Sequence, residues 1–422
     1  MLSFLSRRDF MKLSASGALA APLSGWLGAL AGHAAKTEQK QHKACILLWM
    51  DGGPTHKDTF DLKPGTKDAG EFKPIPTSVP GIQISEHLPQ IAKLMNHGAI
   101  LRGMSTGEGA HGRAKYYLHT GYKEGVGGLV YPAMGSIVAK ELGDPKSPMP
   151  NYVTVGRSNY GSGHLGAHYQ PLNVITPSRG VENLRALVEG KQFDGRVGLL
   201  DEMERGFFKD YPADSVKAHQ TTYQRAVTLM QSKEAKAFDL SQESAAAKAA
   251  YGTGTFAEGC LMARRLIETG VKFVEVSLGG WDNHQDLWAR MKVNSAQIDP
   301  AISALINDLK QRGLLDSTLV IWMGDFGRTP KINTRGAKPG RDHYPRAWSS
   351  VMWGGGIKGG QVIGKTDAEG AAVTERPISA VDYMATVCSI LGIDYTKEYQ
   401  TSRGRPVGIV DKGSNPVKEL FA

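Results

Sequence analysis

Three runs of β-favouring apolar residues in this sequence each end close to a glycine and an aspartate. The runs are ACILLWM (44–50), KFVEVSL (272–278) and TLVIWM (318–323), and the aspartates are Asp51, Asp282 and Asp325. Near-continuous apolar runs are typical of strands that are covered on both faces, as in parallel sheets. The carboxyl ends of parallel strands meet at one edge, where open α/β sheets bind their ligands. The chain is therefore predicted to bring three carboxylates to one sheet edge.

Helical patterns alternate with these runs along the chain. Further strands are predicted at 99–104, 152–156 and 350–355, and helices at 86–95, around 214–249, at 254–270 and at 286–313. In the last helix, apolar residues recur at helical spacing and predict its core-facing stripe: Ile298, Ile302, Leu305, Ile306 and Leu309. The alternation favours an α/β fold with a largely parallel sheet. No repeat or break in composition divides the chain, so residues 36–422 are predicted to form a single domain.

Composition argues against several other classes of protein. With 422 residues, of which 41% are hydrophobic and 22% charged, the chain can bury a large core. Its net charge is +9, but no Lys/Arg-rich run or basic stripe appears, so nucleic acid is not an expected partner. The three cysteines, Cys45, Cys260 and Cys388, lie far apart in apolar segments and lack the spacing of a zinc ribbon. They are predicted to be buried thiols.

The amino terminus carries an export motif. Residues 6–35, SRRDFMKLSASGALAAPLSGWLGALAGHAA, combine Arg7 and Arg8 with a modestly apolar stretch and small residues near its end. This pattern resembles the twin-arginine signals that carry folded bacterial proteins across the inner membrane. We expect residues 1–35 to be the signal, cleaved near 34–35, the twin-arginine translocase to be a partner, and the periplasm to be the destination. The stretch falls short of the ~20 apolar residues of a span, so no stable membrane span is expected after cleavage. A permanently uncleaved anchor is the alternative.

A metal ion would explain why three carboxylates gather near histidines. Any single aspartate at a strand end is more often a helix cap or a turn former. Three together would repel one another unless a cation neutralises them, and His284 and His343 lie close by in the sequence. Mixed Asp and His ligands suit zinc, manganese or iron better than calcium. The sequence therefore predicts a divalent metal site, with zinc as the first choice.

Longer motifs add a family resemblance. WMDGGPTHKDTFDLKP, GGWDNH, DLKQRGLLDSTLVIWMGDFGRTPKIN, GRDHYPRAWSSVMWGGGIKGGQVIGKTD and VDYMATVCSILGID resemble the family called domain of unknown function 1501, over essentially the whole chain after the signal. That family belongs with the alkaline-phosphatase-like superfamily, which includes phosphatases and sulfatases. The resemblance implies a three-layer sandwich, in which helices flank a mostly parallel central sheet, and a site for one or two divalent ions.

The resemblance also implies metal ligands by position. The matching positions are Asp51, Asp282, His284, Asp325 and His343. His284 follows its aspartate at a tighter spacing than in alkaline phosphatases, which leaves Asp286 as a substitute. Phe326 stands where a histidine often follows the third aspartate. One expected nitrogen ligand is therefore missing.

The largest departure from the family pattern lies in GEGAHGRAKYYLHTGY (107–122). Phosphatases and sulfatases place a hydroxyl or modified cysteine at a helix start, at a fixed distance before a Thr-Gly pair. Counting back from Thr120-Gly121, that position is His111. The nearest hydroxyls lie at other offsets: Ser105 and Thr106. His111 is predicted to be a ligand that compensates for the missing histidine, or else a nucleophile that forms a phosphohistidine, and we favour the ligand.

Basic residues beside these motifs are candidates for holding an anionic group: Arg113, Lys115, Arg328 and Arg341. Of these, Arg113 and Arg341 join His111 in the predicted catalytic set. The leading interpretation is an exported, metal-dependent hydrolase-like protein that acts on a phosphate or sulfate ester or a related anion. The alternative is a catalytically inactive periplasmic binding or assembly protein that retains the fold and a structural metal, and the missing hydroxyl favours it.

Overall fold

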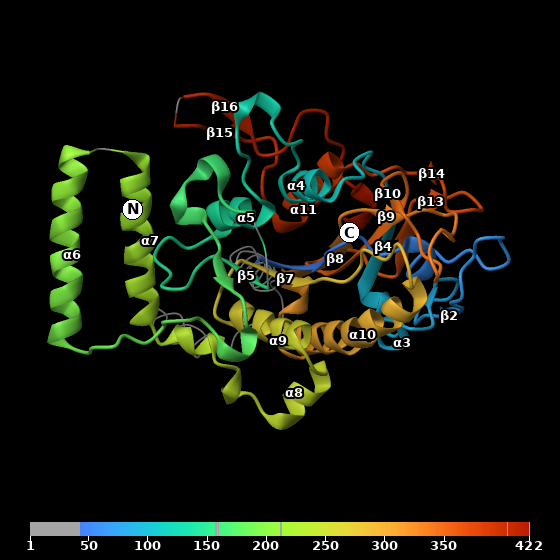
Figure 1. Ribbon diagram of the computed structural model, residues 1–422, viewed down its shortest axis with the longest axis horizontal. Helices are drawn as coiled ribbons and strands as arrows, with labels where there is room; N and C mark the ends of the chain where they lie inside the picture. The colour runs from blue at the N-terminus through green and yellow to red at the C-terminus, as the bar shows by residue number, and fades with distance from the viewer. Residues whose placement is uncertain (1–42, 157, 159, 212, 403, 422) are drawn as a thin grey trace, which may run out of the picture. The chain divides into compact units, whose positions relative to one another are not determined.

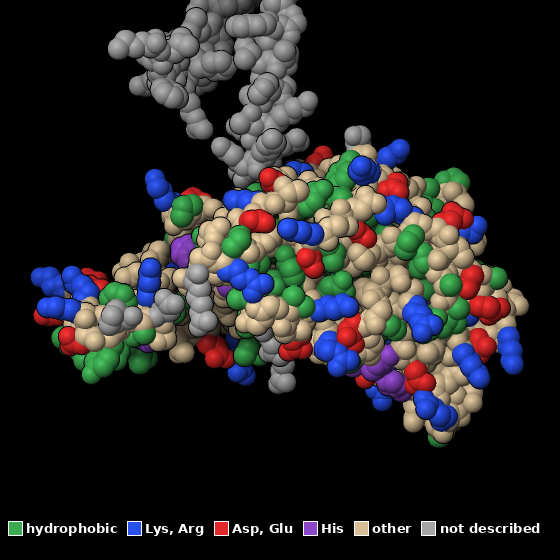
Figure 2. All heavy atoms as spheres, turned by 90° about the horizontal axis from the view of Figure 1, so that it is seen from above, with side chains coloured by type: hydrophobic (Ala, Val, Ile, Leu, Met, Phe, Trp, Pro, Cys, Tyr) green, Lys and Arg blue, Asp and Glu red, His purple; other side chains and the backbone are tan. Residues whose placement is uncertain are grey.

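The computed structural model of the protein describes residues 43–421, with the exception of positions 157, 159, 212 and 403. The export signal predicted for residues 1–35 lies outside the described residues. Along the described part of the chain, no helix combines the length and the apolar character needed to cross a membrane. Lys and Arg side chains are interspersed with Asp and Glu over the face shown in Figure 2.

An eight-stranded sheet runs through the described part of the molecule, in the order β12-β4-β11-β8-β1-β7-β5-β6. Its strands are β1 (Ala44–Met50), β4 (Gly98–Met104), β5 (Tyr152–Val155), β6 (Leu172–Val174), β7 (Phe273–Leu278), β8 (Thr318–Gly324), β11 (Trp348–Gly354) and β12 (Gln361–Ile363). β1 pairs in parallel with both β7 and β8. Among these eight strands, only β11 runs antiparallel to its neighbours. The predicted α/β fold with a mostly parallel sheet is confirmed.

Helices cover both faces of this sheet (Figure 1). Side chains of β1 alternate between two hydrophobic clusters, with Ile46, Leu48 and Met50 in one and Cys45, Leu47 and Trp49 in the other. The first cluster includes side chains of α3 (Pro89–Ala92), α9 (Thr255–Glu268) and α10 (Leu287–Gln311). The second includes side chains of α4 (His111–Thr120), α5 (Met134–Leu142) and α11 (Ala380–Leu391). The fold is thus the predicted three-layer sandwich.

Two predictions about the core are confirmed. The stripe expected along α10 is fully buried, at 0% exposure: Ile298, Ile302, Leu305, Ile306 and Leu309. All three cysteines are buried free thiols. Periodicity therefore identified which face of this long helix packs against the sheet.

A helical hairpin lies between β6 and β7 in the chain. It consists of α6 (Lys191–Asp210) and α7 (Asp214–Met230), at the left of Figure 1, and α8 (Ala245–Tyr251) follows. The helix predicted around 214–249 is wrong in extent, because α7 ends at Met230. α6 was not predicted, since its glycines weaken the helical pattern and it buries no residue among those described.

Four short two-stranded sheets contain the remaining described strands. They are β2 (Pro74–Pro76) with β3 (Gln83–Ser85), β9 (Gly327–Arg328) with β10 (His343–Tyr344), β13 (Lys365–Thr366) with β14 (Val373–Glu375), and β15 (Glu398–Gln400) with β16 (Pro406–Gly408). The pair β9–β10 sets His343 opposite Arg328. This small ladder brings the distal histidine to the end of β8.

Candidate metal centre

The three strand-end aspartates lie at one edge of the sheet. Asp51 and Asp325 directly follow β1 and β8, and Asp282 lies shortly after the end of β7. The backbone N–H of Gly52 donates to Asp325 Oδ1 over 3.4 Å. Gly52 has φ +113°, and a Cβ there would lie 2.4 Å from the backbone nitrogen of Asp282. Only glycine allows the turn after β1 to approach Asp282 this closely.

His111, the first residue of α4, reaches into this cluster. Its Nδ1 lies 2.5 Å from Asp325 Oδ2, so it must carry the proton that the carboxylate accepts. Its Nε2 lies 3.3 Å from Asp282 Oδ2 and is buried without a hydrogen-bond partner among the described residues. The hydrogen bond to Asp325 raises the pKa of His111 above its usual value, against the opposing effect of burial.

His343 is held in the same manner. Its Nδ1 donates to the carbonyl of Gly109 over 2.9 Å, which leaves the Nε2 lone pair facing Asp282 Oδ1 at 3.1 Å. Burial lowers the pKa of His343, and Arg328 lowers it further. Both effects favour the neutral ring, which is the form of imidazole that binds a metal.

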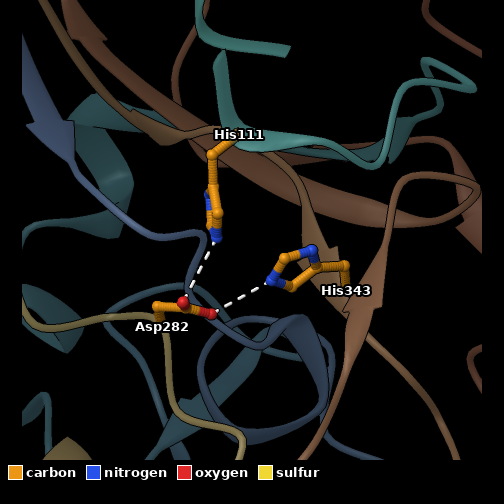
Figure 3. Close-up of side chains that lie close together, drawn as sticks. All are labelled: His111, Asp282 and His343. Atoms are coloured by element: carbon orange, nitrogen blue, oxygen red, sulfur yellow. Dashed lines mark hydrogen bonds and ion pairs between the residues drawn. The ribbon is translucent and has the colours of Figure 1, made fainter. Parts of the chain in front are cut away.

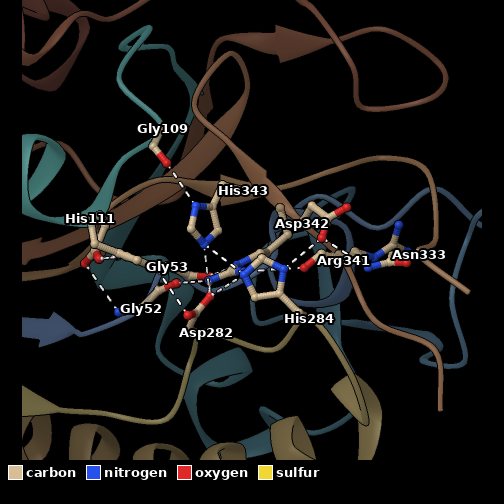
Figure 4. A network of polar contacts seen from close by, with 12 residues as sticks. Gly52, Gly53, Gly109, His111, Asp282, His284, Asn333, Arg341, Asp342 and His343 are labelled. Atoms are coloured by element: carbon tan, nitrogen blue, oxygen red, sulfur yellow. Dashed lines mark hydrogen bonds and ion pairs between the residues drawn. The ribbon is translucent and has the colours of Figure 1, made fainter. Parts of the chain in front are cut away.

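His284 repeats the arrangement from the loop after β7. Its Nδ1 donates to Asp342 Oδ1 over 2.7 Å, and its Nε2 lies 3.0 Å from both Asp282 Oδ1 and His343 Nε2. Acceptor atoms at this distance repel one another unless a proton or a cation lies between them. Figure 4 shows the resulting network, in which three imidazoles turn toward one carboxylate.

Three side chains of this cluster could hold a metal ion. The ligand atoms of His111, Asp282 and His343 all lie within 4.8 Å of one another (Figure 3). Tetrahedral zinc with bonds of about 2.0–2.1 Å places its ligand atoms roughly 3.3 Å apart, close to the contacts around Asp282. Ligating histidines commonly donate their other N–H to a carboxylate or a carbonyl, as these rings do.

Arg328 fixes the central carboxylate. Its side chain is fully buried, and it donates to Asp282 Oδ1 over 2.7 Å and to the carbonyls of Gly52, Gly53 and Arg341. Burial acts to raise the pKa of Asp282, but the hydrogen bond and charge of Arg328, with His111 and His343, bring it down to about 2. Asp282 is therefore a carboxylate at neutral pH. Because each nitrogen of this buried side chain donates to a protein oxygen, Arg328 acts here by positioning Asp282.

Phe326 forms a wall of the centre at the position where the resemblance implies a histidine. Its ring centroid lies 4.9 Å from that of His111 and 4.7 Å from that of His343. It offers no ligand atom, so it packs the two imidazoles without binding an ion. His111 offers a further nitrogen, Nε2, which faces Asp282, while its Nδ1 donates to Asp325.

Two of the residues predicted to be catalytic lie elsewhere. Arg341 is fully buried, its Nε donates to Asp58 over 2.9 Å, and its other nitrogens donate to backbone carbonyls. Arg341 is thus engaged by Asp58 and by backbone carbonyls, and its contact with substrate stays a prediction. Arg113 is 63% exposed and pairs with Glu108 on the surface. Asp286, the substitute ligand, pairs with Lys338.

Two groups that orient the histidines of the centre were not predicted from the sequence. Asp342 orients His284, and the carbonyl of Gly109 orients His343. Lys115, expected to hold an anion, places its ammonium against Asp51 Oδ1 and 3.8 Å from Asp325 Oδ2. The spacing of Lys115 indicates that it belongs to the centre, since it lies one helical turn after His111 on the same face of α4.

Comparison with known proteins gives structural neighbours and a family. No curated protein matches the chain by sequence. The PsFucS1 sulfatase from Pseudoalteromonas sp. is 12% identical, with a TM-score of 0.41 over 86% of this chain and 70% of that chain. The lipoteichoic acid synthase LtaP from Listeria monocytogenes is 12% identical, with a TM-score of 0.35 over 84% of this chain and 72% of that chain.

A protein in the alkaline phosphatase superfamily from Vibrio parahaemolyticus is 11% identical, with a TM-score of 0.36 over 83% of this chain and 67% of that chain. Likeness at this level does not assign an activity. The family model is more direct, because it matches residues 42–421. The chain belongs to the family described as protein of unknown function (DUF1501), as the sequence motifs predicted.

Proposed function

We propose that this protein is a metal-dependent hydrolase that acts on a phosphate or sulfate ester or a related small anion. The observation that carries the proposal is the centre formed by His111, Asp282 and His343. Both imidazoles commit Nδ1 to an acceptor and turn Nε2 toward a carboxylate that Arg328 keeps ionised. A donor set of this kind is built to hold a cation.

Zinc is the preferred ion, with manganese or iron as alternatives. Two imidazole nitrogens and one carboxylate oxygen suit borderline divalent metals. Three protein ligands are typical of catalytic zinc sites, which keep a position open for substrate or water. His284 lies beside the set and can serve as a fourth ligand. A bound ion would supply Lewis-acid polarisation of the ester oxygen.

The start of α4 is suited to an anion. Its N-cap residue, Ala110, makes no side-chain cap hydrogen bond, while its backbone N–H donates to Glu108 Oε1. A Cβ on Gly112 would meet no described atom within 4 Å, so the first turn is open. The free N–H groups and positive end of a helix attract phosphate or sulfate groups. In this proposal the helix start binds the anion directly beside the imidazole of His111.

Water is the proposed attacking group. No hydroxyl stands at position 111, and His111 uses Nδ1 to hold Asp325, so its Nε2 is assigned to the ion. His111 as the nucleophile would need the same Nε2 free of the ion. The two roles therefore exclude each other in one catalytic cycle.

Export is part of the proposal. The pair Arg7 and Arg8 in residues 1–35 supports transport by the twin-arginine translocase into the periplasm. Replacing both arginines with lysine is expected to leave the precursor in the cytoplasm, as detected by fractionation and blotting. Unchanged periplasmic accumulation would contradict the export proposal and would leave the metal centre unaffected.

Metal content and ester hydrolysis test the hydrolase together. Protein purified from its native compartment is expected to contain a divalent ion, measured by plasma mass spectrometry. It should hydrolyse para-nitrophenyl phosphate or sulfate, and it should lose this activity on chelation and regain it with zinc. A metal-free protein that does not bind added zinc would overturn the proposal. Bound zinc without hydrolysis across an ester panel would favour the inactive binding protein.

A further inference from the structure

Three basic side chains on one face of α4 contact three acidic side chains of the sheet or of its strand ends. His111, Lys115 and His119 follow one another at intervals of four residues, so they lie on the same side of the helix. Their partners belong to three adjacent parallel strands or directly follow them: Asp325 after β8, Asp51 after β1, and Glu275 in β7. The helix thus docks on the sheet through three pairs of a basic residue and an acid.

Lys115 lies at the middle of this series, between two carboxylates. Its Nζ contacts Asp51 Oδ1 and lies 3.8 Å from Asp325 Oδ2. The side chain of Asp325 has 0% exposure, and that of Lys115 only 23%. The side chain of Asp51 is 43% exposed, but Asp325 is shielded from water, so a positive charge beside the two carboxylates stabilises them.

The surroundings of Asp51 and Asp325 do not fit a metal ion. Phe326, next in the chain, has no ligand atom. The Nδ1 of His111 carries a proton that it donates to Asp325 Oδ2, and Asp325 Oδ1 accepts from the backbone of Gly52. An ion there would have to displace Lys115 and would meet two carboxylates with no nitrogen donor free among the described neighbours. Zinc sites are normally completed by further protein ligands.

We infer that the ammonium of Lys115 is a built-in cation between Asp51 and Asp325, so that the centre takes one metal ion and not two. The inference rests on the proposed function for the ion at His111, Asp282 and His343. The fixed charge also holds Asp325 in place to orient His111. Lys115 is thus a positioning residue for the metal centre.

Zinc stoichiometry tests the number of ions. Mature protein is stripped with a chelator, dialysed and titrated with zinc chloride in a calorimeter. One ion per chain is the expected result. Two ions per chain would overturn the inference while the proposed centre stood. If no zinc bound, both the proposed metal centre and the inference of one ion per chain would be overturned. The role of Lys115 as a countercharge would then be decided by the next experiment.

A double-mutant cycle of Lys115 and Asp51, measured in metal-free protein, tests whether Lys115 is the countercharge. Lys115→Met is expected to lower the Tm by about 5 °C or more, because it removes the ammonium beside Asp51 and Asp325 and leaves two neighbouring carboxylates without that cation. Adding Asp51→Asn to this variant should recover most of the loss, and Lys115→Arg should be mild. Lys123→Met is the control, since Lys123 is exposed. Additive effects of Lys115→Met and Asp51→Asn would overturn the inference. If Lys115→Met alone does not fold, recovery by the double variant still decides.

Discussion

His111 and Asp325 are joined by a 2.5 Å hydrogen bond from Nδ1 to Oδ2, and this contact sets what the rest of the ring can do. Asp325 is fully buried at the end of a central strand, so the ring is anchored to a rigid element. The unpartnered Nε2 then has one direction in which to point, toward Asp282. A carboxylate that orients a ligating imidazole in this way also raises its basicity.

Loss of His343 should weaken metal binding strongly. His343→Ala removes one of three ligands, so zinc affinity should fall by more than the about 10–100-fold that loss of an outer partner costs. Zinc should also raise the Tm much less, because an ion that binds only the folded state stabilises it by an amount that grows with the logarithm of its affinity. Calorimetry and thermal melts with zinc measure both effects.

His219→Ala is the matched control for this prediction. His219 lies on α7 and is 67% exposed, paired with Glu204. It should leave zinc affinity and Tm unchanged. Equal zinc affinity in the His343 and His219 variants would place the ion elsewhere on the protein.

Asp58 shows where sequence reasoning stops for this protein. It lies in the first family motif but matches no predicted ligand position, yet its side chain is fully buried and bonded to Arg341 and Trp288. Strand positions followed from local apolar pattern, and strand-end acids met because parallel strands share an edge. The pairing of Asp58 with Arg341 depends on how two distant loops fold over the sheet, which no local pattern encodes.

The same distinction separates the members of the metal centre. His343 was predicted because its motif is strong, but its orientation depends on Gly109, which belongs to a distant segment. The spacing of Lys115 from His111 placed both on one helical face. Which acids Lys115 meets depends on where α4 docks on the sheet. The sequence therefore identifies these residues, but it does not show which distant segments they contact.

Breaking the pair of Arg341 and Asp58 should destabilise the fold without affecting the ion. Arg341→Met leaves a buried, unpaired carboxylate, which costs about 3–5 kcal/mol of unfolding free energy. Zinc affinity of the folded protein should stay unchanged, because Arg341 does not contact the ligands through its side chain. Urea denaturation and calorimetry measure the two properties.

Arg113→Gln provides the comparison on the protein surface. Arg113 is 63% exposed, so its replacement should change stability by no more than about 0.5 kcal/mol. If Arg341→Met kept full stability but lost ester hydrolysis, the catalytic role predicted for Arg341 from sequence would be supported.

Gly52 should be more sensitive to alanine than Gly65, although both have positive φ, at +113° and +83°. A Cβ on Gly65 meets no described atom within 4 Å, so Gly65→Ala should cost only backbone strain of about 1–3 kcal/mol. A Cβ on Gly52 would lie 2.4 Å from the backbone of Asp282. Gly52→Ala should therefore unfold more easily and also bind zinc more weakly, as Asp282 moves. Equal zinc affinity in both variants would show that Asp282 does not hold the ion.

The two roles of His111 make different predictions. As a ligand, His111 contributes Nε2 to the ion, so His111→Ala should lower zinc occupancy. His111→Cys should retain part of it, because thiolate also binds zinc. As a nucleophile, His111 would form an acid-labile phosphohistidine, and His111→Ala would abolish turnover while zinc occupancy survived. Plasma mass spectrometry of each variant, with acid-stability tests of protein incubated with a phosphate ester, separates the two. The hydrogen bond to Asp325 fixes the ring in either role, but the approach of Nε2 to Asp282 at 3.3 Å favours the ligand.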